Sequence, residues 1–89
     1  MAIDGGERIL EIVMPRLGSA PVGTILRWMV GEGDVVDVGD VLAEIDAEKV
    51  TTEIESPARA RVTQLLASVD DEVPVGTPIA VLEPLDTSR

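Results

Sequence analysis

The sequence predicts an all-β fold, either a sandwich or a barrel, and three observations favour this class. β-Branched residues are abundant, and no stretch of eleven residues keeps a helical period. Short apolar runs recur along the chain with turn-forming residues between them. The second half of the chain also repeats the pattern of the first half. Many short strands joined by regular turns are typical of such folds.

Six apolar runs are the expected strands. The run "VTTEIE" alternates strictly, with Val50, Thr52 and Ile54 on one face, which is typical of a half-buried strand. The other runs are more uniformly apolar, and residues such as Gly, Pro, Asp and Ser separate them. In chain order the runs cover residues 9–14, 23–30, 41–45, 50–55, 60–67 and 78–82. The flanking segments 1–8 and 85–89 are polar or contain glycine, and we expect them to be tails.

An internal repeat indicates two similar half-domains. Shifted by 37 residues, the segment "DVVDVGDVLAEI" (34–45) aligns with "DEVPVGTPIAVL" (71–82). The identical pairs are Asp34/Asp71, Val36/Val73, Val38/Val75, Gly39/Gly76 and Ala43/Ala80. Chance similarity between Val- and Gly-rich strands is the alternative explanation. We favour a pseudo-two-fold axis that relates the halves, with each half contributing strands to both sheets.

The repeat also predicts where the turn "DAEK" (46–49) lies. Ile45 ends the repeated strand in the first half, and Leu82 ends it in the second half. The chain leaves the fold after Leu82, whereas after Ile45 it turns and returns as the strand 50–55. We therefore expect the turn 46–49 at the pole opposite both chain ends, as an exposed antiparallel hairpin.

Composition excludes several classes of function. The net charge of −10, from 17 acidic and 7 basic residues, argues against binding to nucleic acid, which needs a basic surface. Because the chain has no His and no Cys, it lacks the usual general base, the strongest nucleophile and any thiolate metal ligand. We therefore expect a single small domain with no catalytic residue, no metal site and no enzyme activity of its own.

The cellular location is predicted from the apolar runs and from the start of the chain. The runs are too short to span a bilayer, and the first residues lack the order of a signal peptide. We expect a cytoplasmic protein without membrane contact.

Lys49 is the only lysine of the chain, and this makes it the leading candidate for a functional residue. A lone amine on a rigid, exposed tip suits enzymatic acylation, and carrier domains hold lipoamide or biotin through such an amide. A solubilising role is the plainer explanation for a surface lysine. The turn is also rich in acids, since six lie nearby in the sequence: Asp40, Glu44, Asp46, Glu48, Glu53 and Glu55.

Four motifs, in this order and spacing, resemble the lipoyl domains of 2-oxo acid dehydrogenase complexes. They are "IVMPRLG" (12–18), "GTILRWMVGEGDVVDVGDVLAEI" (23–45), "EKV" (48–50) and "DDEVPVGTPIAVLEP" (70–84). The resemblance covers residues 9–84, and within these complexes it is to the lipoyl domain of the dihydrolipoyl acyltransferase component. Residues 85–89 would then be either a tail or the start of a linker. It implies a flattened β-barrel or sandwich of two antiparallel sheets, with lipoic acid attached covalently to Lys49.

The resemblance also implies partners. A thiamine-dependent 2-oxo acid decarboxylase would acylate the arm, an acyltransferase core would pass the acyl group to coenzyme A, and dihydrolipoamide dehydrogenase would reoxidise the arm. A lipoate ligase, or an octanoyl transferase with lipoyl synthase, would load the lysine, and the isolated domain would be a monomer. Partner recognition would involve the hairpin residues Asp46, Ala47, Glu48 and Val50, and the loop residues Leu17, Gly18, Ser19, Ala20, Pro21 and Val22.

Several positions depart from the pattern of that family. Glu48 replaces the usual aspartate, and the loop "GSAPVG" is a residue shorter than expected and lacks acids. Ala60 stands where a glycine is usual, and it would be strained if the position needs a positive φ. Among the remaining residues, we expect Trp28 in the core and Met14 in an edge contact.

Three other functions remain open from the sequence. A biotin carboxyl carrier shares the lysine hairpin, but that family typically flanks its lysine with methionines, and here the neighbours are Glu48 and Val50. A glycine-cleavage carrier is usually longer. An unmodified, lipoyl-like interaction module is the third alternative, and such modules lack the acidic turn with its lysine.

Overall fold

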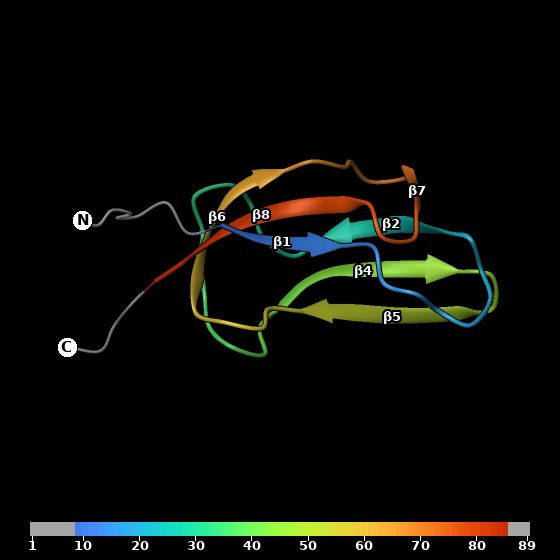
Figure 1. The fold of residues 1–89 in the computed structure, drawn as a ribbon, viewed down its shortest axis with the longest axis horizontal. Coiled ribbons are helices and arrows are strands. Elements are labelled where there is room, and N and C mark those ends of the chain that lie inside the picture. The colour runs from blue at the N-terminus through green and yellow to red at the C-terminus, as the bar shows by residue number, and fades with distance from the viewer. Residues whose placement is uncertain (1–8, 86–89) are drawn as a thin grey trace.

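The computed structural model describes residues 9–85, which form eight strands and contain no helix. The strands are β1 (Leu10–Val13), β2 (Val22–Trp28), β3 (Val35–Val36), β4 (Val41–Ala47), β5 (Val50–Glu55), β6 (Ala60–Leu65), β7 (Glu72–Pro74) and β8 (Pro78–Pro84). They build two antiparallel four-stranded sheets, ordered β1-β8-β6-β3 and β5-β4-β2-β7 (Figure 1). The all-β prediction is confirmed, and of its two forms the sandwich is correct, because the sheets do not close into a barrel.

Every predicted run overlaps a strand, but two strands fall outside the runs. The strands β3 and β7 have only two and three residues, which is too short for an apolar pattern to reveal. Both lie within the repeated segments. No helix of the described residues could span a membrane.

The predicted pseudo-two-fold symmetry is confirmed by the strand boundaries. A shift of 37 residues moves β4 onto β8 and places β2 and β3 over β6 and β7. The edge strands β5 and β1 then take equivalent places beside β4 and β8. Even the register shifts correspond, since one lies between Ile25 and Arg27 and its counterpart lies between Val62 and Gln64.

The residues that repeat between the halves stabilise the same turns. Asp34 accepts a hydrogen bond from the Gly31 N–H at 2.8 Å, and Asp71 accepts one from the Ser68 N–H at 2.8 Å. Gly39 and Gly76 have φ values of +89° and +90°, in the left-handed region that favours glycine. Turn geometry therefore explains two of the identities that were found in the sequence.

The core lies between the sheets and is aliphatic. Its largest fully buried side chains include the equivalent pairs Ile25/Val62, Leu42/Ile79 and Ile45/Leu82. Trp28 packs against this core while half-buried, and its indole N–H donates to the Ala67 carbonyl at 2.9 Å. The expectation for Trp28 thus holds in part.

The expectation for Met14 was wrong, and the condition under which Ala60 would be strained is not met. Met14 is fully buried instead of lying at an edge. Its side chain uses the space that Gly23 leaves by having no Cβ, since a Cβ there would come within 2.5 Å of the Met14 sulfur. In the other half Ser56 takes the place of Met14, and Ala60 takes the place of Gly23. Ala60 lies in β6 without a positive φ, so it carries no backbone strain there. Methionine and glycine thus occupy in one half the positions that serine and alanine occupy in the other.

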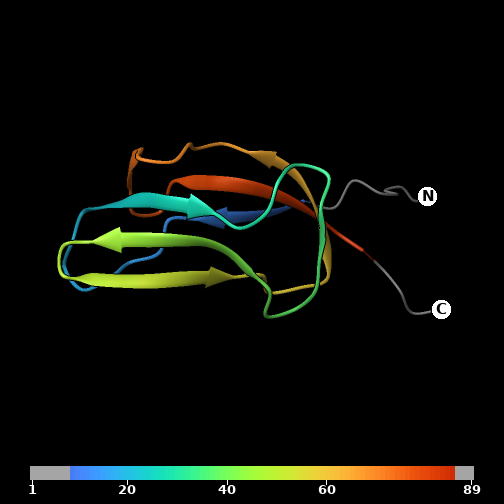
Figure 2. The same ribbon diagram turned by 180° about the vertical axis from the view of Figure 1, so that it is seen from behind.

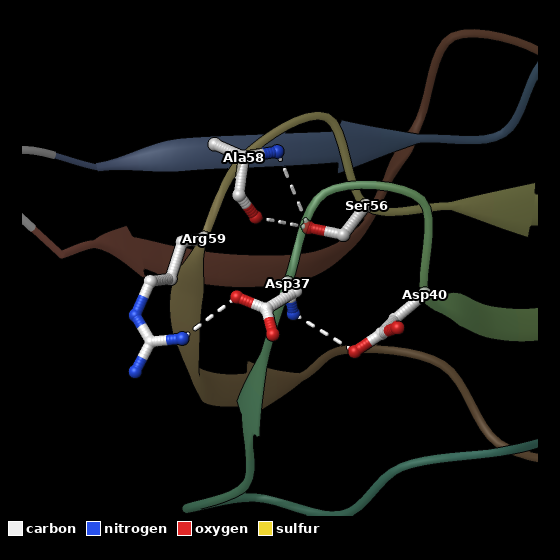
Figure 3. A network of polar contacts seen from close by, with 5 residues as sticks. All are labelled: Asp37, Asp40, Ser56, Ala58 and Arg59. Carbon is white, nitrogen blue, oxygen red and sulfur yellow. Dashed lines mark hydrogen bonds and ion pairs between the residues drawn. The ribbon is translucent and has the colours of Figure 1, made fainter.

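The two poles of the sandwich differ. The β4–β5 hairpin lies at one pole, and the start of β1 and the end of β8 lie at the other (Figures 1 and 2). At the latter pole Arg59 pairs with Asp37 at 2.7 Å (Figure 3). There the Leu85 N–H also donates to the Arg59 carbonyl at 2.9 Å. The predicted tails, 1–8 and most of 85–89, lie outside the described residues.

Candidate functional site

The hairpin turn is shorter than the sequence suggested. Ala47 pairs directly with Val50, so Glu48 and Lys49 alone form the turn. The expected four-residue turn 46–49 is therefore wrong by two residues. The error arose because the apolar pattern stops at Ile45, whereas backbone pairing continues for two more residues along β4.

Asp46 and Ala47 are consequently strand residues. Asp46 is half-buried instead of exposed, and its carboxylate accepts a hydrogen bond from the Thr51 hydroxyl at 3.3 Å. Ala47 is only 4% exposed. The contribution of Thr51 was missed from the sequence, although a two-residue turn would have placed position 51 opposite position 46.

Glu48 has a left-handed backbone, with a φ of +54°. Two-residue hairpin turns require a positive φ at one or both central positions, which usually selects Gly, Asn or Asp. A glutamate at this position is uncommon, because its Cβ crowds the backbone in the left-handed region.

Lys49 is exposed at the end of this turn. Within residues 9–85 its amine forms no hydrogen bond and no ion pair. Val50 follows it, and this side chain is 46% exposed. The amine is therefore open to an approaching enzyme, and two paired strands hold its backbone.

The acids near Lys49 are fewer than the sequence suggested. Asp40 precedes β4 by one residue and lies about 23 Å along the strand from the turn, at the rise of a β-strand. Glu55 pairs with Val41 at the same far end. Glu44 is neutralised in part by Arg27, with 3.1 Å between Nε and Oε1. Asp46 and Glu48 are thus the acids closest to the amine along the hairpin.

The loop between β1 and β2 lies at the same end of the molecule as the hairpin (Figures 1 and 2). It spans residues 14–21, whereas its counterpart in the other half has only residues 56–59. This loop and the hairpin are therefore two features that differ between the halves, and they share one pole.

The predicted recognition residues have unequal access to solvent. Ala20 is buried, and its N–H donates to the Leu17 carbonyl at 3.2 Å, while Leu17 packs against the core. The Pro21 carbonyl accepts from the Val75 N–H at 3.0 Å. The residues that offer exposed surface are Gly18, Ser19 and Pro21, and Val22 already begins β2.

Comparison with known proteins places this architecture in a family. The sequence profile of the biotin/lipoyl family, described as "Biotin-requiring enzyme", matches residues 10–82. The chain belongs to the biotin/lipoyl family. The resemblance expected from the sequence is thereby confirmed at the level of the family.

Similar proteins within the family are much longer than this chain. Over 71 residues, 44% are identical to the dihydrolipoyllysine-residue acetyltransferase component of pyruvate dehydrogenase complex of Corynebacterium glutamicum, covering 79% of this chain and 10% of that protein. Over 75 residues, 44% are identical to the pyruvate dehydrogenase E1 component subunit beta of Rhizobium meliloti, covering 82% of this chain and 16% of that protein. The chain thus spans between a tenth and a sixth of these relatives.

A solved structure has the same fold. The single-chain, multi-domain long-chain acyl-CoA carboxylase superposes with a TM-score of 0.75 and 18% identity, covering 98% of this chain and 8% of that one. At this identity the likeness concerns the fold alone.

The hairpin fits the kind of group that the family name describes. Lipoic acid and biotin are both held as amides of a lysine side chain. The amine of Lys49 is exposed, it has no partner within residues 9–85, and the turn places it beyond the paired strands. In the same residues no group of three or more His, Cys, Asp or Glu side chains is arranged to hold a metal ion.

Proposed function

We propose that this chain is a lipoyl carrier domain, in which Lys49 holds lipoic acid and the arm shuttles acyl groups and electrons between the active sites of a 2-oxo acid dehydrogenase complex. The observation that carries the proposal is the position of the only lysine, at the tip of a two-residue hairpin in a chain of the biotin/lipoyl family. Relatives named as components of the pyruvate and 2-oxoglutarate dehydrogenase complexes support the choice of lipoic acid.

The chain contributes attachment and presentation, and the chemistry belongs to its partners. Lys49 and lipoic acid condense to an amide with the loss of water, and a ligase couples this step to the cleavage of ATP. When bound, the lipoyl group supplies a disulfide that can accept an acyl group together with two electrons. The rigid hairpin keeps the arm beyond the sandwich, so that it can reach one active site after another.

The proposed partners follow from the carrier role. They are a thiamine-dependent 2-oxo acid decarboxylase, an acyltransferase core, dihydrolipoamide dehydrogenase and the lipoylating enzymes. Such a domain is not an enzyme by itself and serves, or forms part of, a dihydrolipoyl acyltransferase.

Intact mass tests the proposal directly. After incubation with lipoate, ATP and a lipoate ligase, we expect the full chain to gain the mass of one lipoyl group, and Lys49→Arg to gain none. Lys49→Arg keeps the positive charge and therefore controls for folding and solubility. Modification by biotin in the presence of a biotin ligase would instead identify a biotin carrier. An unmodified chain with both ligases would identify an interaction module.

Reductive acylation then tests the complex. The lipoylated chain is mixed with a 2-oxo acid and its decarboxylase, and we expect a mass gain of one acyl group with one of the substrates pyruvate and 2-oxoglutarate. No gain with either substrate would contradict a role in these two complexes.

A further inference from the structure

Glu48 stands out among the residues with a positive φ. Six residues of the described chain have one, and four of them are glycines: Gly18, Gly33, Gly39 and Gly76. The two others are Glu48, at +54°, and Asp70, at +75°. Aspartate tolerates the left-handed region better than most residues, because its short carboxylate can bond to the local backbone. Glutamate has one more methylene and lacks that advantage.

The Glu48 carboxylate does not explain why this residue occupies the turn. Within residues 9–85 the side chain of Glu48 makes no hydrogen bond and no ion pair, and it is exposed. By contrast, its backbone has a definite task, since a positive φ lets the chain reverse in two residues while Ala47 still pairs with Val50.

Asp70 offers a matched position at which a positive φ serves another turn. The pseudo-symmetry relates Asp70 to Gly33, whose φ is +96°. The Asp70 N–H donates to the Ile25 carbonyl at 2.7 Å, and the Gly33 N–H donates to the Val62 carbonyl at 2.7 Å. Strain introduced at position 70 therefore affects the fold without touching the hairpin turn.

We propose that Glu48 positions Lys49 for attachment of its group through its left-handed backbone, and that its carboxylate is dispensable for that attachment. This inference rests on the proposed carrier function. A residue that resists a positive φ would widen the turn and break the Ala47–Val50 pair. The tip would then lose its fixed geometry, and the amine would no longer stand where a modifying enzyme meets it.

Substitutions at position 48 distinguish a role of the backbone from a role of the carboxylate. Glu48→Gln keeps the shape and removes the charge. Glu48→Asn shortens the side chain by one methylene and removes the charge, and Glu48→Gly removes the side chain, while both residues tolerate a positive φ. Glu48→Val opposes a positive φ more than glutamate does because it is β-branched, whereas Glu48→Ala keeps the same Cβ and removes only the rest of the side chain. Asp70→Ala and Asp70→Val impose the same kind of strain at the matched position.

The experiment measures the rate of lipoylation by intact mass, with lipoate, ATP and a lipoate ligase, and the melting temperature of each full-length variant. We expect the Gln, Asn and Gly variants at position 48 to keep kcat/KM within about twofold, because they allow the same turn. Glu48→Val should lower kcat/KM by about tenfold or more through misplacement of the amine, whereas Glu48→Ala should stay within about twofold, because an alanine Cβ resists a positive φ no more than the Cβ of glutamate. Asp70→Val should lower the melting temperature and leave kcat/KM unchanged.

Two results would overturn the inference. One is an equal loss of rate in Glu48→Gln and Glu48→Gly, which would assign the role to the carboxylate. The other is an unchanged rate in Glu48→Val. If the wild-type chain is not modified at all, the carrier function fails, and the melting temperatures still test the turn. Glu48→Asn should then be more stable than Glu48→Ala, and the reverse order would contradict the role of the backbone.

Discussion

At the scale of single residues, the site and the core depend on pairs of neighbours. In the hairpin turn, Glu48 has the positive φ that reverses the backbone, and Lys49 presents its amine to solvent. In the core, Met14 packs against Gly23, while the equivalent buried positions of the other half hold Ser56 and Ala60.

Substitution of Gly23 tests this packing. Gly23→Ala should destabilise the fold by about 1–3 kcal/mol, because its new Cβ meets the Met14 sulfur and Ile45 in a closed core. Met14→Ser should also be destabilising, through loss of a buried side chain. Together the two changes recreate the Ser56/Ala60 arrangement, so they should cost at least about 1 kcal/mol less than the sum of the single changes.

Urea unfolding followed through the fluorescence of Trp28, the only aromatic residue, measures these free energies. Strict additivity of the two substitutions would contradict this packing of Met14 against Gly23.

At the scale of elements, each half-domain depends on an aspartate that closes its turn. Asp34 and Asp71 accept backbone N–H groups at the same distance, 2.8 Å, in equivalent turns before β3 and β7. A carboxylate that accepts a backbone N–H stabilises a turn that neither short strand could hold by pairing alone.

Alanine substitution at either aspartate should therefore have the same effect. We expect Asp34→Ala and Asp71→Ala each to lower the free energy of unfolding by about 1 kcal/mol, since both bonds are solvent-exposed. Glu11→Ala, on the exposed face of β1, serves as the control and should change stability by less than about 0.5 kcal/mol. Urea midpoints measure all three, and a clear difference between the two aspartates would contradict the equivalence of the turns.

At the scale of the whole molecule, negative charges far outnumber positive ones. The net charge of −10 is spread over 89 residues, and among the described residues only two ion pairs offset it, Arg27–Glu44 and Arg59–Asp37. Exposed pairs of this kind contribute little to stability. Self-repulsion therefore opposes the compact state at low ionic strength.

Salt should consequently stabilise this protein. Sodium chloride at 1 M shortens the Debye length to about 3 Å and should raise the melting temperature relative to a solution at 0.01 M, where the length is about 30 Å. Lys49→Arg keeps the charge and should show the same salt response as the wild type, whereas Lys49→Glu should show a steeper one. A melting temperature independent of salt would contradict a destabilising self-repulsion.

The amino-acid sequence alone determined the fold class, the symmetry and the pole at which Lys49 lies. Alternating and apolar runs reveal strands because side chains alternate along a strand, and repeated residues such as Gly39 and Gly76 mark equivalent turns. The repeat predicted that the hairpin after β4 and the chain end after β8 occupy equivalent positions in the two halves, and therefore lie at opposite poles. Each of these inferences needs only residues that are close in sequence, or the comparison of one half with the other.

Only the tertiary structure decided the register and the packing. The turn contracts to Glu48 and Lys49 because β4 and β5 pair up to Ala47, and this places Asp46 in a strand beside Thr51. Met14 is buried because Gly23 leaves space for it. These features depend on contacts between different strands, and no local pattern of residues specifies how far a backbone ladder continues or which side chain fills the space opposite a glycine.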